Sequence, residues 1–138
     1  MKNVLLFSFL IVGLMFTACS DDDEDDHDHD HGDANITIEF LEPVNDEVVA
    51  SPDDVHVHVR VTADAEFHEV EIEMYPVNDP SDLIIDFEQH AHDTSFDFEN
   101  DNNLSGYPAG TEFEIDVEVY KDHEGTDYVE SEINFRIP

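Results

Sequence analysis

The stretch "VHVHVRV", residues 55–61, decides the fold class, because its four valines alternate strictly with polar residues. Successive side chains of an extended strand point to opposite faces, so this pattern buries one face and leaves the other in water. The segment therefore predicts a strand whose valines point into a core. His56 and His58 have the opposite parity and are expected to point outward.

The same period of two recurs through residues 35–138. Seven segments show it: 36–40, 55–61, 70–74, 83–87, 96–98, 113–119 and 133–137. Turn signals such as Ser51-Pro52-Asp53 and Glu124-Gly125 separate them. Seven short strands in a domain of this length predict an all-β, immunoglobulin-like (fibronectin III-like) β-sandwich. The domain departs from antibody domains in having neither tryptophan nor a disulfide.

The N-terminus has the organisation of a signal peptide over residues 1–18. Lys2 precedes the apolar run "VLLFSFLIVGLMF", which is too short to span a bilayer comfortably. The following Thr17-Ala18-Cys19 resembles a bacterial lipobox, which implies cleavage before Cys19 and a diacylglycerol on its thiol. Cys19 is the only cysteine, so no intrachain disulfide can form. The alternative is an ordinary signal peptide with a chance cysteine.

The residues after Cys19 indicate where in the cell the protein is displayed. "CSDDDE", residues 19–24, resembles the acidic export signal of Bacteroidota surface lipoproteins. The resemblance implies display on the outer face of the outer membrane, with the lipid as the anchor. The alternative is a generic acidic tether on the periplasmic leaflet.

The domain itself resembles the small immunoglobulin-like domains of Bacteroidota surface lipoproteins that have no assigned activity. The resemblance rests on "ITIEFLEPVNDEVV" (36–49), "FHEVEIEMY" (67–75) and "VEVYKDHEGTDYVESEINFRI" (117–137). It spans most of residues 36–138 and implies a surface accessory module. It carries over no catalytic residues.

The chain thus divides into a signal peptide (1–18), an acidic His-rich tether (19–34) and one domain (35–138). The sequence has 37 Asp and Glu against 4 Lys and Arg, and loss of residues 1–18 removes Lys2, so the mature charge is 3 − 37 = −34. Such a surface repels nucleic acid and attracts cations. Solubility in a saline habitat is a competing explanation for the overall charge, but it does not explain where the histidines lie.

The chain has nine histidines, all of them after the signal peptide. Three lie in the tether stretch "DHDHDHG", residues 26–32. In an immunoglobulin-like sandwich, the connections after the second, fourth and sixth strands share the end at which the first strand begins. His68, His90, His92 and His123 are therefore expected at one pole together with the tether, whereas His56 and His58 lie toward the other.

Imidazole and carboxylate together suit Zn²⁺, Cu²⁺ or Ni²⁺. The candidate metal ligands are His27, His29, His31, His68, His90, His92, Asp93 and His123, with His56 and His58 as a weaker pair. The tether alone is also consistent with a solvated leash. Ca²⁺ is the alternative for "DFENDNN" (97–103), but this stretch lacks the glycine and spacing of an EF-hand and is interpreted as a turn.

An enzyme is not expected, because the sequence has no nucleophile elbow, phosphate-binding loop or catalytic cysteine. Two function classes remain. The first is a surface lipoprotein that captures or buffers a divalent transition metal, with an outer-membrane transporter or another surface protein as its partner. The second is an immunoglobulin-like adhesion or interaction module of a surface nutrient-uptake assembly, in which the histidines are incidental.

Overall fold

The computed structural model describes residues 34–138, so Cys19 and the tether histidines His27, His29 and His31 lie outside the described residues. The strands are β1 (Ile36–Glu42), β2 (Glu47–Val48), β3 (Val55–Pro76), β4 (Ile85–Asn102), β5 (Glu112–Tyr120) and β6 (Tyr128–Arg136). The all-β prediction is confirmed for this part of the chain. Residues 34–138 contain no helix long and apolar enough to cross a membrane.

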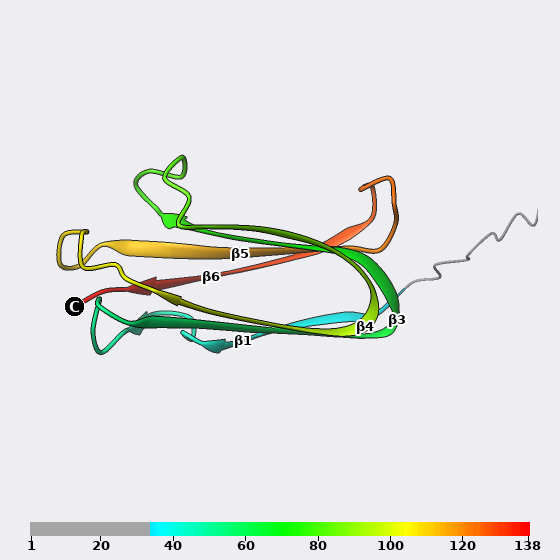
Figure 1. Cartoon of the computed structure of the whole chain (residues 1–138), viewed down its shortest axis with the longest axis horizontal. Coiled ribbons are helices and arrows are strands. Elements are labelled where there is room, and N and C mark those ends of the chain that lie inside the picture. The colour runs from blue at the N-terminus through cyan, green and yellow to red at the C-terminus, as the bar shows by residue number, and fades with distance from the viewer. Residues whose placement is uncertain (1–33) are drawn as a thin grey trace, which may run out of the picture.

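One sheet curls into two facing layers, because β3 and β4 run through both of them (Figure 1). In the first layer, the first half of β3 pairs with β1 and with the second half of β4. In the second layer, the second half of β3 pairs with the first half of β4 and with β5, and β5 pairs with β6. All of these pairings are antiparallel, whereas the short β2 lies parallel to β6.

Residues 34–138 form six strands, not the seven short strands that were expected. Segments 55–61 and 70–74 belong to β3, and segments 83–87 and 96–98 belong to β4. Neither bend contains a glycine or proline that would end a strand. The register of the β3–β4 pair instead shifts between Thr62 and Phe67 and again between Phe67 and Glu69. Such bulges bend a strand without ending it.

The core fills the space between the two layers. Val57, Val59 and Val61 are fully buried, which confirms the inward face predicted from the sequence. They belong to the same cluster as Phe113 and Phe135 of the opposite layer. Each such side chain contributes about 1.5–3 kcal/mol when it is fully buried, so this cluster holds the layers together.

Candidate metal centre

His68 occupies the bulge at which β3 turns from one layer into the other. Before the bulge the odd-numbered residues are buried, and after it the even-numbered residues Val70 and Ile72 are buried. The bulge therefore brings two successive side chains, Phe67 and His68, to the inner side. His68 is 2% exposed and is the single buried polar or charged residue in the described part of the chain.

His92 and His123 reach His68 from two other parts of the fold. His92 is an exposed residue of β4, at the bend of that strand. His123 is an exposed residue of the β5–β6 connection. In that connection the Asp122 carboxylate accepts hydrogen bonds from the Thr126 amide at 2.9 Å and its hydroxyl at 2.6 Å. Gly125 has a φ of 66°, which the turn requires and glycine adopts without strain.

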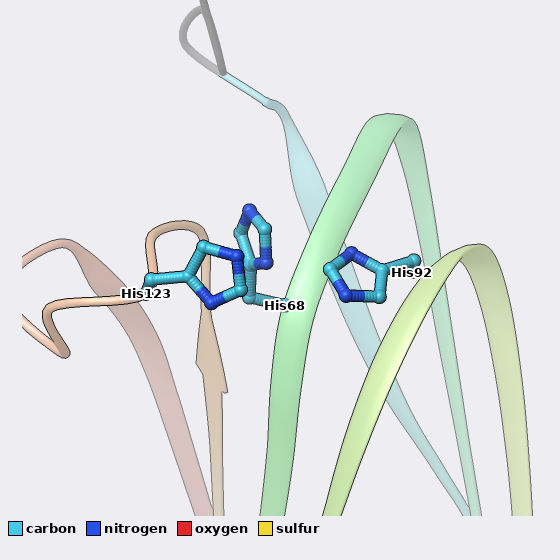
Figure 2. Close-up of side chains that lie close together, drawn as sticks. All are labelled: His68, His92 and His123. Carbon is cyan, nitrogen blue, oxygen red and sulfur yellow. The ribbon is translucent and has the colours of Figure 1, made fainter. Parts of the chain in front are cut away.

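The three imidazoles lie side by side at the pole where β3 bends, as Figure 2 shows. Ring centroids are 4.0 Å apart for His68 and His123, 4.8 Å for His68 and His92, and 5.6 Å for His92 and His123. One nitrogen from each ring can be chosen so that all three lie within 4.8 Å of one another. This group, the His triad below, offers three nitrogen ligands on a protein of high negative charge.

Two of the expected pole ligands do not belong to the His triad. The His90 ring is 69% exposed, and its Nδ1 lies 3.1 Å from a Glu69 carboxylate oxygen. The same nitrogen is 3.4 Å from the carbonyl oxygen of His68. Asp93 is exposed, pairs with Phe67 in the β3–β4 register, and is not grouped with the three rings.

His56 and His58 lie on the outer face of the first layer, each beside a carboxylate of β4. His56 Nδ1 is 2.6 Å from Asp101 Oδ1, and this hydrogen bond raises the pKa of His56. His58 Nε2 is 3.3 Å from Asp97 Oδ1. The His56 and His58 ring centroids are 6.1 Å apart.

The stretch 97–103 was interpreted as a turn, and for most of its length this is wrong. Residues 97–102 continue β4 as a regular strand. Its acids lie opposite basic side chains of β3: Asp101 pairs with His56, Glu99 with His58 and Asp97 with Arg60. The cross-strand hydrogen bonds of the two histidines and the Arg60–Asp97 ion pair favour a strand where the local composition favoured a turn.

The sequence reasoning missed a second group of potential ligands on the outer face of the second layer. Carboxylate oxygens of Asp116, Glu118 and Glu130 lie within 4.8 Å of one another. Burial, followed by the charges of Glu130 and Glu118, raises the pKa of Asp116 to about 6. The alternating acids of β5 in "EFEIDVEVY" are the signal that could have revealed this group. Acidic groups of this kind are common without an ion, so it is a weaker candidate than the His triad.

No protein-family model matches the chain, and no curated protein matches it. Two solved structures show a partial likeness: catalytically inactive OgpA from Akkermansia muciniphila in complex with an O-glycopeptide (glycodrosocin) substrate, and wild-type OgpA from the same organism. They are 16% and 17% identical to this chain, each with a TM-score of 0.42. Each match covers 72% of this chain and 28% of the other, so this chain spans less than a third of the length of OgpA.

Proposed function

We propose that the His triad binds one divalent transition metal ion, and that the protein is a surface-anchored lipoprotein that captures or buffers this metal. The observation that carries the proposal is the convergence of His68, His92 and His123 from β3, β4 and the β5–β6 connection. Three imidazoles are the protein ligands of His₃ zinc sites.

The geometry of the His triad is close to what such an ion needs. Zinc–nitrogen bonds of about 2.0–2.1 Å in a tetrahedral site place the ligand atoms roughly 3.3 Å apart. The three nitrogens already lie within 4.8 Å of one another. His68 is buried and fixes one ligand, whereas the exposed His92 and His123 can close the remaining gap by rotating.

The identity of the ligands narrows the class of metal. Neutral imidazole suits Zn²⁺, Cu²⁺ and Ni²⁺, whereas Ca²⁺ and Mg²⁺ prefer oxygen ligands. Three protein ligands leave a fourth tetrahedral position for water or another ligand, as in open zinc sites. Such a site exchanges its ion more readily than a closed four-ligand site, which suits capture or buffering.

The cellular setting in this proposal comes from the sequence. The lipobox-like residues before Cys19 and the acidic run after it support an outer-membrane lipoprotein that is exposed at the cell surface. An outer-membrane transporter is the partner that would receive a captured metal.

We propose, more specifically, that the two-layer sheet is an immunoglobulin-like, fibronectin III-like sandwich. The composition of the layers supports it: β1, β3 and β4 form one layer, and β4, β3, β5 and β6 form the other. Counted by layer, β3 and β4 each supply two strand segments, and with β1, β5 and β6 this makes the seven segments of such a domain.

Calorimetric titration with Zn²⁺ at pH 7.5 tests the proposed metal site, using the chain from Ser20 onward. Replacing His92 and His123 by alanine should weaken binding of the first equivalent at least about 100-fold, because even outer-shell partners of a metal are worth 10–100-fold. The matched control is His56→Ala with His58→Ala, which removes two histidines from the other pole and should leave binding unchanged. Equal affinity of both variants and the parent would overturn the proposal and favour the interaction module.

A further inference from the structure

A cavity of about 420 Å³ lies where the chain passes from the end of β1, through β2, to the start of β3. The chain changes layer here, because β1 pairs with β3 in the first layer and β2 pairs with β6 of the second. The cavity is separate from the His triad. One of its lining residues, His56, precedes His68 by 12 residues of β3.

The inner part of the cavity wall is apolar. Pro43, Val49 and Val55 line the cavity, and all three are buried. Sites for small organic ligands have such walls, with a few polar groups, and volumes of about 300–1,000 Å³. A ligand with an apolar body can therefore lose water-exposed surface in this cavity, whereas a bare ion cannot gain in this way.

The charged side chains around the cavity are the acids Glu42, Glu47 and Asp54, and no lysine or arginine lines it. Glu47 holds the turn before β2, since its carboxylate accepts a hydrogen bond of 2.9 Å from the Val44 amide. Glu42 and Asp54 are exposed at the cavity and available to a ligand. Three carboxylates repel an anionic ligand and attract a cationic one.

The basic side chains of residues 34–138 do not neutralise these acids, because each forms an ion pair outside the cavity. The pairs are Arg60–Asp97, Lys121–Asp127 and Arg136–Glu112. His56 Nδ1 lies 2.6 Å from Asp101 Oδ1, so a proton on this ring is offset by a carboxylate that does not line the cavity. The counter-charge for the cavity acids must come from a ligand or from solvent ions.

We infer that this cavity binds a small alkylammonium ion, with its ammonium group at Glu42 and Asp54 and its alkyl chain against the apolar wall. A metal ion suits the cavity less well. Within residues 34–138, the groups of three potential ligands whose atoms lie within 4.8 Å of one another include no residue of this cavity. An ammonium group does not need such convergence, because its three N–H donors can each reach a different oxygen.

The test is an amide NMR titration of the chain from Ser20 onward with n-butylammonium chloride at pH 7.5. About 0.15 M NaCl is present to screen the general charge of the surface. We expect saturable shift changes at Val49, Ala50 and Val55. Methylammonium should bind at least about 10-fold more weakly, because it lacks the apolar chain. n-Butanol and n-butyrate, which have no positive charge, should produce no saturable change at these residues.

Two variants locate the charge that binds the ligand. Glu42→Gln with Asp54→Asn should weaken n-butylammonium binding about 10-fold, because each accessible charge pair contributes up to a few-fold. Asp86→Asn with Glu88→Gln is the matched control. It removes the same charge from exposed residues of β4 outside the cavity and should leave binding unchanged.

Three results would overturn the inference. Shift changes that do not saturate, or an equal loss of affinity in the two variants, would mean that the ammonium ion is attracted only by the acidic surface as a whole. Equal binding of n-butanol would mean that the cavity does not select a cation.

Discussion

The imidazole rings of His68 and His123 lie with their centroids 4.0 Å apart, although one ring is buried in β3 and the other is exposed in the β5–β6 connection. Burial fixes the side chain of His68, whereas the exposed side chain of His123 can rotate. The bulge in β3 sets the position of His68, whereas the turn closed by Thr126 and Gly125 sets the position of His123. The two residues should therefore differ in what they contribute to folding.

Without metal, His68→Ala should lower the free energy of unfolding by about 1–3 kcal/mol, because it removes a buried polar side chain from a packed site. His123→Ala should change it by less than about 0.5 kcal/mol, as expected at an exposed position. Urea denaturation in the presence of a chelator measures both values. Equal effects would show that burial does not distinguish the two histidines.

Asp116→Asn should stabilise the protein at neutral pH. The pKa of Asp116 is raised to about 6 in the folded state, so the folded protein holds this proton more tightly than the unfolded chain does. The stabilisation from protonated Asp116 is therefore complete below about pH 3.8 and is lost as the pH rises through about 6. At pH 7.5 the ionised carboxylate opposes folding, and its removal should gain about 1 kcal/mol after allowance for solvent screening.

Thermal melts of Asp116→Asn and the parent at several pH values check this expectation. The variant should melt roughly 4 °C or more above the parent at pH 7.5. The two curves should converge only below about pH 3.8, where the Asp116 carboxyl is protonated in the unfolded chain as well as in the folded protein. A constant difference across this range would mean that packing, and not charge, is responsible.

The second layer should make the protein sensitive to salt. Glu73 and Glu132 flank Asp116 across the strands, and Glu118 lies opposite Glu130. Such like-charge pairs are destabilising, and salt screens them. We expect the melting temperature to rise with NaCl and to rise further with millimolar Ca²⁺. The double variant Glu118→Gln with Glu130→Gln should melt at a higher temperature than the parent at low salt, and its melting temperature should rise less with NaCl. An equal rise in both proteins would mean that other charges are responsible for the repulsion.

The proposed lipid anchor has a separate test in cells. Cys19→Ala should release the protein from the outer-membrane fraction, because the thiol that would carry the lipid is gone. Replacing Asp21–Glu24 by alanines should leave the protein in the membrane but remove its access to external protease. Retention of the Cys19→Ala variant in the outer membrane would exclude the anchor, and unchanged protease access would exclude the acidic export signal.

Alternation of apolar and polar residues was sufficient to predict the strands and the inward valines Val57, Val59 and Val61, because burial on one face of a strand is a local property. It could not predict that β3 and β4 continue through both layers. At residues 62–69 the parity of buried positions changes from odd to even without any glycine or proline. A bulge of this kind depends on the partner strand, which the local sequence does not specify.

The site was predicted in part. His68, His92 and His123 were expected at one pole, and the structure brings these three together. His90 and Asp93 were expected with them, but His90 pairs with Glu69 in the β3–β4 register and places its Nδ1 3.1 Å from the Glu69 carboxylate, whereas Asp93 pairs with Phe67. The register of the bent strands, which sets these partners, cannot be derived from the local sequence. Asp116, Glu118 and Glu130 were missed because acids are so frequent in this chain that no single one stands out.

Anomalous diffraction at the zinc edge, from crystals of the chain grown with one equivalent of Zn²⁺ at pH 7.5, would locate the bound ion. We expect a single strong peak at about 2.0–2.1 Å from one ring nitrogen each of His68, His92 and His123. A peak at Asp116, Glu118 and Glu130, a peak between His56 and His58 in its place, or no peak at all would contradict the claim that the His triad is the metal site.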